Sequence, residues 1–159
     1  MSQNRWQSMH ERFCEVLVST GLLSRSQLEE TLHDYRESGL KLGEFLIHKG
    51  LLRENQLVDL LSKHLRIDRF DAEHFVENER LKTILPPTFA KKHHLVPLEA
   101  DDKTVKVAMT DPLDVTALDA VQRTTNKEAA PVVCTEQELC VLMFSIYNIS
   151  SELDEGLGR

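Results

Sequence analysis

The chain has 159 residues, of which 41% are hydrophobic and 28% charged, and its formal net charge at pH 7 is −7. This composition is typical of a folded globular protein and argues against a disordered chain. The negative net charge argues against a nucleic-acid polymer as partner, because such binding needs a basic surface. No segment reaches the roughly 18 apolar residues of a membrane span, and residues 1–6 lack the apolar run of a signal peptide, so the sequence predicts a cytoplasmic protein without direct membrane insertion.

Two segments near the amino terminus, residues 12–35 and 41–64, align with each other without gaps. Each contains a short apolar stretch, then Gly-Leu-Leu, a polar triplet and Gln-Leu at the start of a second amphipathic stretch. Gly21 and Gly50 stand where a first helix should end in a left-handed residue, which glycine adopts without strain. The pattern therefore predicts a helix, a turn and a helix in each unit.

The second helix of the first unit has a recognisable start. Ser24 followed by Gln27 predicts a capping box, in which each residue bonds to the backbone of the other. Leu28 and Leu32 then follow on one helical face, as Leu57 and Leu61 do in the second unit. Leucines at this spacing are also what a bare helical scaffold would contain, so the periodicity alone does not identify a ligand.

The next part of the chain changes to shorter elements. Residues 81–85 predict a helical turn, and Pro87 suits the first turn of a helix that continues to His93. Residues 95–99 and 104–109 have the composition of two strands joined by a tight turn.

The last part continues this alternation of elements. Residues 111–126 predict a helix and residues 130–134 a strand, and Thr135 with Glu138 predicts a second capping box for a closing helix. Strands that alternate with helices indicate a small mixed α/β subdomain. The expected fold is α+β, with a four-helix tandem repeat over residues 1–65, a small mixed α/β subdomain over residues 66–148 and a flexible tail over residues 149–159.

The sequence contains no pattern that supports catalysis. The phosphate-binding motifs GxxxxGK[ST] and GxGxxG are absent, as are HExxH and GxSxG, so we expect no enzymatic activity from this chain. Cys14, Cys134 and Cys140 form no CxxC pair, which argues against disulfides and a thiolate zinc site. His93 and His94 diverge as neighbours on a helix, so they indicate a surface cluster, and no metal or cofactor is expected.

The start of each repeat unit is the most suggestive part of the chain for ligand binding. Arg12 and Lys41 open these units, and a cation at the start of a helix can hold a phosphate or the edge of a guanine. Gly43 stands where the first unit has Cys14. A glycine there permits either a positive φ or a close approach of the ligand.

At this point the residues resemble a known family. The paired units, with the pattern R-L-G-x-x-L-x-x-x-G-x-x-x-x-x-x-L-x-x-x-L-x-x-Q, are similar to the MshEN domain, the amino-terminal domain of the assembly ATPases of type II secretion systems and type IV pili. Leu85-Pro86-Pro87, Val96-Pro97-Leu98 and residues 105–114 resemble the carboxy-terminal part of that domain. The best-known members bind cyclic di-GMP, so the resemblance implies this nucleotide as the candidate ligand.

The chain departs from the family pattern at several positions, both polar and apolar. Lys41 replaces Arg, Phe13 replaces Leu, Cys14 replaces Gly, and Tyr35 and His64 replace the final Gln of each unit. Tyrosine and histidine can still stack or hydrogen-bond in place of an amide. The resemblance implies a ligand-binding set of Arg12, Phe13, Cys14, Leu28, Leu32, Tyr35, Lys41, Leu42, Gly43, Leu57, Leu61 and His64.

Two functions follow from the resemblance. The first is a regulatory module that binds cyclic di-GMP along both repeats and acts on a secretion or pilus ATPase, in the same chain or as a separate partner. The alternative is a degenerate repeat without nucleotide binding, which docks onto a secretion or pilus ATPase or onto a cytoplasmic platform protein of such a machine.

Overall fold

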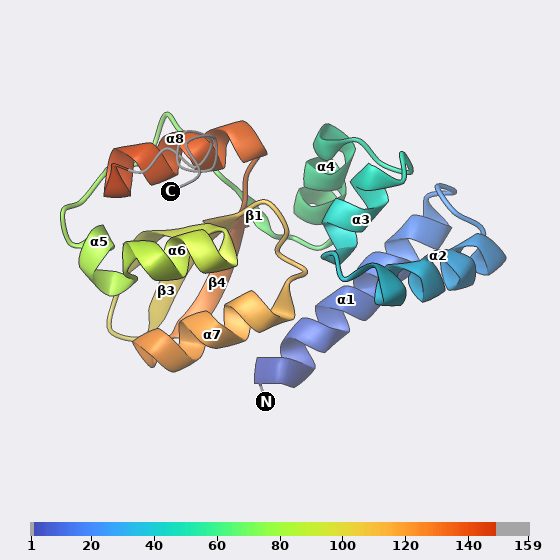
Figure 1. The fold of residues 1–159 in the computed structure, drawn as a ribbon, viewed down its shortest axis with the longest axis horizontal. Coiled ribbons are helices and arrows are strands. Elements are labelled where there is room, and N and C mark those ends of the chain that lie inside the picture. Colours follow the sequence, from blue (N-terminus) through green and yellow to red (C-terminus); the bar gives the residue numbers. More distant parts are fainter. Residues whose placement is uncertain (1, 149–159) are drawn as a thin grey trace. The chain divides into compact units, whose positions relative to one another are not determined.

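The computed structural model describes the backbone of residues 2–148 and the side chains of residues 9–148, and the tail expected over residues 149–159 lies outside this range. The chain forms two compact units. The first contains the residues up to Ile67 together with Leu113–Val115, and the second contains the residues from Asp68 onward that remain. Helices alone make up the first unit, and a sheet with helices makes up the second, so the predicted α+β fold class is confirmed (Figure 1).

The first unit consists of α1 (Ser2–Ser19), α2 (Arg25–Ser38), α3 (Leu42–His48) and α4 (Glu54–His64). The prediction that a helix opens at Arg12 is wrong, because α1 already begins at Ser2. The residues before Arg12 include no glycine or proline, so nothing in them interrupts a helix. The helix α2 also runs into the expected spacer and ends only at Gly39, whose φ is 76°.

The predicted turns of the repeat are confirmed. Gly21 and Gly50 have φ values of 79° and 77° and end the first helix of each unit. Ser24 Oγ accepts a hydrogen bond from the backbone N–H of Gln27 at 3.1 Å, and Gln27 Oε1 accepts one from the backbone N–H of Ser24 at 2.8 Å. The same glutamine position in the second unit, Gln56, caps the N–H of Arg53 at 2.9 Å.

The core of the first unit is built from both repeats. The helix α1 packs against α2 and α4. The side chains that fill the space between the helices are at most 3% exposed and include Phe13, Leu17, Leu42, Phe45, Leu46, Leu57 and Leu61.

The second unit contains a four-stranded sheet in the order β1-β4-β3-β2. Its strands are β1 (Asp68–Arg69), β2 (Leu95–Ala100), β3 (Thr104–Met109) and β4 (Glu128–Val133). β2 and β3 are antiparallel, as the tight turn between them predicts, whereas β4 is parallel to both β3 and β1. The sequence analysis missed β1, which has only two residues.

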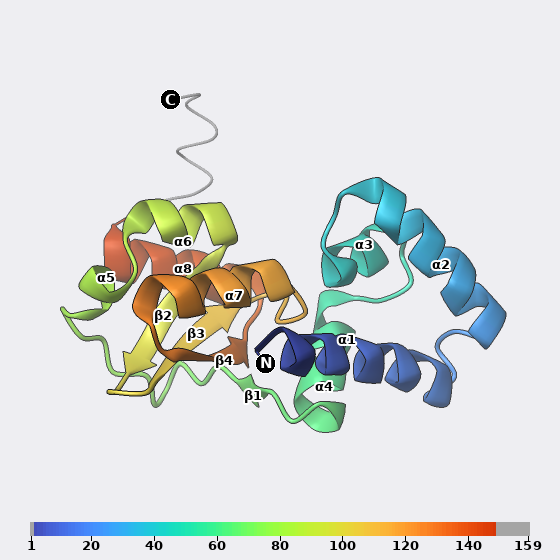
Figure 2. The same cartoon turned by 90° about the horizontal axis from the view of Figure 1, so that it is seen from below.

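Four helices accompany this sheet: α5 (Leu81–Ile84), α6 (Pro87–His93), α7 (Val115–Thr125) and α8 (Glu136–Tyr147) (Figure 2). The helix α7 begins later than the predicted residue 111. The helices α5, α6 and α8 pack against β2. Leu139, Leu142 and Met143 of α8 share a buried cluster with Val96 of β2 and Val132 of β4.

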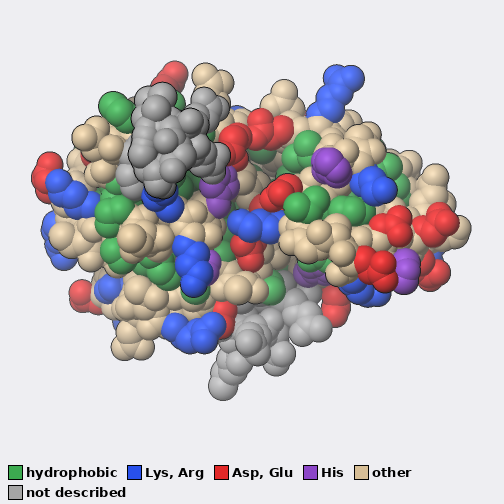
Figure 3. Space-filling model, viewed as in Figure 1, with side chains coloured by type: hydrophobic (Ala, Val, Ile, Leu, Met, Phe, Trp, Pro, Cys, Tyr) green, Lys and Arg blue, Asp and Glu red, His purple; other side chains and the backbone are tan. Residues whose placement is uncertain are grey.

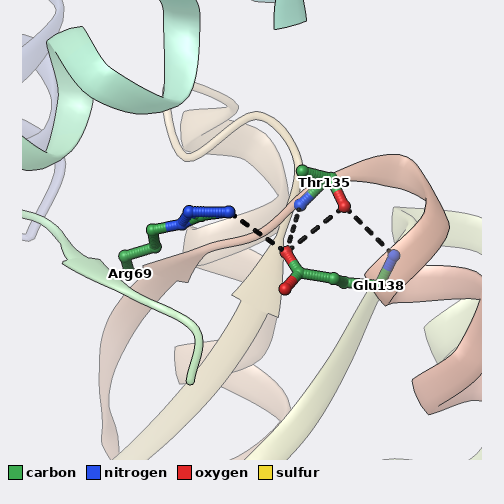
Figure 4. Close-up of polar contacts among 3 residues, drawn as sticks. All are labelled: Arg69, Thr135 and Glu138. Atoms are coloured by element: carbon green, nitrogen blue, oxygen red, sulfur yellow. Dashed lines mark hydrogen bonds and ion pairs between the residues drawn. The ribbon is translucent and has the colours of Figure 1, made fainter. Parts of the chain in front are cut away.

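The start of α8 has the predicted capping box, with an added ion pair (Figure 4). Glu138 Oε1 accepts hydrogen bonds from the backbone N–H and the hydroxyl of Thr135, at 2.9 and 3.2 Å, and Thr135 Oγ1 accepts one from the N–H of Glu138 at 3.2 Å. The guanidinium of Arg69 on β1 lies 3.9 Å from the same carboxylate. The cap thus joins the shortest strand to the last helix of the unit.

Candidate functional site

Lys41 stands at the start of the second repeat, where the sequence analysis expected a ligand-binding cation. It is the residue before α3, with φ −72° and ψ 152°. Its Nζ lies 3.1 Å from Asp114 Oδ2, and the two side chains are 34% and 14% exposed. Asp114 belongs to the short segment Leu113–Val115 that packs with the helical unit. The structure therefore adds a half-buried carboxylate to the candidate site.

The sequence analysis did not select Asp114 as a site residue. It lies within the segment 105–114 that resembles the family, which was the only signal that pointed to it. No spacing rule relates this segment to Lys41, because the pairing depends on how the chain returns to the helical unit. Together the two side chains offer a cation and a hydrogen-bond acceptor at one place, which suits a ligand that has both an anionic group and N–H donors.

The first repeat presents a different arrangement. Arg12 is exposed in the interior of α1, so no helix start lies beside it. Phe13 is wholly buried in the core. Burial, with a smaller effect of Glu11, raises the pKa of the half-buried Cys14 thiol, and the opposing effect of Arg36 is weaker. Cys14 is therefore a neutral thiol at pH 7 and is poorly suited to act as a nucleophile.

Tyr35 joins a series of aromatic rings. Its ring centroid lies 6.4 Å from that of His10 on α1 and 6.0 Å from that of Phe45 on α3. Lys49 Nζ lies 5.8 Å from the Phe45 centroid. Burial is the main cause that lowers the pKa of His10, so this imidazole is neutral at pH 7. The sequence analysis found Tyr35 but not its ring neighbours, which come from two other helices.

The remaining members of the predicted set divide by burial. Leu28, Leu42, Leu57 and Leu61 are at most 7% exposed and pack in the core. Gly43 is buried in the first turn of α3, where the backbone is helical, so it does not adopt the positive φ that a glycine there would permit. The members of the set that retain exposed side-chain surface are Arg12, Cys14, Leu32, Tyr35, Lys41 and His64.

The surface beside Phe45 is acidic. A groove of about 750 Å³ between α2 and α3 is lined by Asp34, Glu37 and Glu44, and Lys49 is the one Lys or Arg among its lining residues. Three carboxylates disfavour a phosphate there. An anionic ligand on this unit is therefore better accommodated near Lys41 than in this groove.

Other candidate sites do not coincide with the predicted residues. A larger cleft of about 970 Å³ in the second unit is lined by residues of β1, the loop after it and the turn between β2 and β3, and it includes no member of the predicted set. Within the described residues, no group of three or more His, Cys, Asp or Glu side chains could hold a metal ion. Over the same range, no helix combines the length and apolar character needed to cross a membrane.

Comparison with known proteins relates the second unit of the chain to a family. Residues 65–143 match the model of the MshEN domain family. The type IV pilus assembly ATPase PilB of Myxococcus xanthus is 29% identical over 128 residues, which are 80% of this chain and 23% of that protein. PilB of Thermus thermophilus is 28% identical over 128 residues, which are 79% of this chain and 14% of that protein. The chain thus spans less than a quarter of the length of these relatives.

Solved structures extend the likeness to the helical unit. The structure of MshE with cdg superposes with a TM-score of 0.67 at 27% identity and covers 86% of this chain and 99% of that one. The amino-terminal domain of XpsE superposes with a TM-score of 0.65 at 25% identity, covering 87% and 96% of the two chains. The family match begins at residue 65, whereas the alignments with the two PilB proteins and the superpositions cover 79% or more of the chain and therefore include part of the repeat.

Proposed function

Because residues 65–143 belong to the MshEN domain family, we propose that this chain is a non-catalytic regulatory module of a type IV pilus or type II secretion ATPase and that it binds cyclic di-GMP on its helical unit. The observation that supports the ligand most directly is the pairing of Lys41 with Asp114 at the start of the second repeat. The likeness to the structure of MshE with cdg supports the choice of cyclic di-GMP as the ligand.

The chemistry of the pair suits half of a cyclic dinucleotide. A guanine offers donors at N1 and N2 and acceptors at O6 and N7, and the neighbouring phosphate is anionic. The carboxylate of Asp114 can accept from the guanine donors, while the ammonium of Lys41 can donate to O6 or to the phosphate.

The first repeat contributes less in this proposal. Arg12 is exposed on the middle of α1 and has no free helix start beside it. Tyr35 offers a ring face for stacking, supported by His10 and Phe45. We therefore expect one half of the ligand to be held by charge and hydrogen bonds at Lys41, and the other half to be held mainly by stacking and by Arg12.

Calorimetric titration of the purified chain with cyclic di-GMP tests the proposal. Lys41→Ala and Asp114→Asn should each weaken binding about tenfold or more, which is about 1.4 kcal/mol. Lys41→Arg should tighten binding by roughly 1 kcal/mol, because the planar guanidinium group of arginine can donate two parallel hydrogen bonds to one ligand group. Arg25→Ala and Asp119→Asn are matched controls, since they remove an exposed cation at the start of α2 and a paired Asp on α7, and they should bind as the parent does.

The docking module is the second candidate, and the changed polar positions of the repeat favour it. Leu28, Leu57 and Leu61 are core residues that a scaffold needs whether or not it binds a nucleotide. The polar positions Tyr35, Lys41 and His64 all differ from the family pattern. A flat calorimetric trace for the parent at high micromolar ligand would contradict nucleotide binding and leave the docking module as the better explanation.

A further inference from the structure

Two surface grooves of this chain, one on each unit, carry opposite charge. The first, which we call the α6–α7 groove, has a volume of about 480 Å³ and contains Phe89, Lys92 and His93 of α6 and Arg123 of α7. No lining residue of this groove is acidic. Lys and Arg side chains lie over these two helices in the space-filling view (Figure 3). Asp119 pairs with Arg123 at 2.6 Å from within α7, and Lys92 adds a further cation.

The second groove is the one between α2 and α3 already described, which we call the α2–α3 groove. Asp34, Glu37 and Glu44 outnumber the cation Lys49 among its lining residues. Asp and Glu side chains also lie over α2 in the space-filling view (Figure 3). Both grooves include one phenylalanine, Phe45 here and Phe89 in the α6–α7 groove, so each combines an apolar surface with charge.

This distribution of charge favours a particular occupant. With a net charge of −7, two copies of the chain repel each other on average. An attractive contact between copies therefore needs a cationic patch against an acidic one, and the two grooves supply that combination. A contact between the α2–α3 grooves of two copies, or between their α6–α7 grooves, would place like charges together and is disfavoured.

We propose that copies of this chain associate head to tail, with the α2–α3 groove of one copy against the α6–α7 groove of the next. The contact joins two different surfaces, so each pair retains one groove of each sign that a further copy can use. Lys41 and Asp114 line neither groove, so substitutions at this contact leave the Lys41–Asp114 pair intact. It should be weakened by salt, since exposed charges on both sides are screened.

Sedimentation velocity of the full chain over a range of concentrations, at low and high ionic strength, tests the proposal. The parent should self-associate at low ionic strength and shift towards the monomer at high ionic strength. Lys92→Glu and Glu37→Lys should each weaken self-association about tenfold or more, because each replaces an attraction with a repulsion. Lys103→Glu and Glu29→Lys change the same charges at exposed positions outside the two grooves, and they should associate as the parent does.

A mixture of the two groove variants gives the sharpest test. Lys92→Glu retains the parental α2–α3 groove, and Glu37→Lys retains the parental α6–α7 groove, so the mixed pair rebuilds the original contact. We expect each variant alone to remain monomeric and the equimolar mixture to form a complex. Circular dichroism should show that both variants are folded.

Three results would overturn the proposal. The first is a parent chain that remains monomeric at every concentration in low salt. The second is self-association that the groove variants and the matched controls change equally. The third is a monomeric parent that binds an added poly-glutamate peptide through Lys92, which would assign the α6–α7 groove to an acidic partner other than a second copy.

Discussion

The side-chain oxygen Oε1 of Gln122 on α7 accepts a hydrogen bond of 3.1 Å from the backbone N–H of Ala129 on β4. β4 pairs with β3 along its whole length, whereas β1 pairs with only the last two residues of β4 on the other side. Alternate residues of a strand direct their N–H groups to opposite sides. On the side of β4 that faces away from β3, Pro131 has no N–H to donate. The N–H of Ala129 on the same side already donates to Gln122. The part of β4 that does not pair with β1 therefore offers few N–H donors for pairing with another strand.

We predict that Gln122→Ala destabilises the chain by about 1–2 kcal/mol, because the N–H of the buried Ala129 loses its acceptor. Gln122→Glu keeps an oxygen acceptor and should cost less. Urea denaturation measures both changes, with Gln137→Ala on the exposed side of α8 as the control. Equal stability of Gln122→Ala and Gln137→Ala would show that the edge hydrogen bond contributes nothing.

The hydroxyl of Tyr147 donates a hydrogen bond of 2.6 Å to the backbone oxygen of Leu85. Tyr147→Phe should therefore lower the free energy of unfolding by about 0.5–1.5 kcal/mol at pH 7. The test is chemical denaturation with α8 otherwise unchanged. An unchanged midpoint would mean that water replaces the bond without loss.

The same tyrosine makes the stability depend on alkaline pH. Burial raises the pKa of Tyr147 well above its usual range. Above about pH 10 the unfolded chain loses this proton while the folded chain keeps it, so the stability contribution is complete below pH 10 and falls as the pH rises. We predict that the unfolding free energy of the parent falls more steeply above pH 10 than that of Tyr147→Phe. Parallel pH profiles of the two chains would contradict the role of burial.

The burial of Leu57 on α4 can be tested by comparison with Leu51, which lies in the turn before this helix. Leu57 is 2% exposed and Leu51 is 38% exposed. Leu57→Ala should cost about 2–5 kcal/mol because it leaves a cavity in the helical core, and Leu51→Ala should cost far less. Thermal and urea unfolding provide the comparison. A similar small loss at both positions would show that the wrong face of the repeat has been assigned to the core.

Gly50 adopts a φ of +77°, and a Cβ atom added at this residue would meet no heavy atom within 4 Å. Only backbone strain therefore opposes a side chain there, and Gly50→Ala should cost about 1–2 kcal/mol. Gly50→Asn should cost less, because asparagine tolerates the left-handed region better than alanine. The ratio of the two losses in urea unfolding checks this explanation. A larger loss for Asn than for Ala would indicate a steric cause.

Features that depend on neighbours along the chain could be predicted from the sequence. The capping boxes of Ser24 with Gln27 and of Thr135 with Glu138 join residues three apart, so residue type and spacing suffice to identify them. The left-handed turn at Gly50 follows in the same way, because glycine alone adopts it freely. The duplicated pattern that contains them also revealed the helical repeat.

Features that depend on contacts between distant segments were decided only by the tertiary structure. The two residues of β1 form a strand because β4 lies beside them, and nothing in their own composition predicts it. Lys41 meets Asp114 because the segment Leu113–Val115 returns to the helical unit. The start of α1 is a different case, since the repeat suggested a boundary at Arg12 that the helix-forming residues before it do not respect. Local hydrogen bonds and backbone preferences act over a few residues, whereas strand pairing and ion pairing depend on which segments the folded chain brings together, and a single sequence carries no direct record of those contacts.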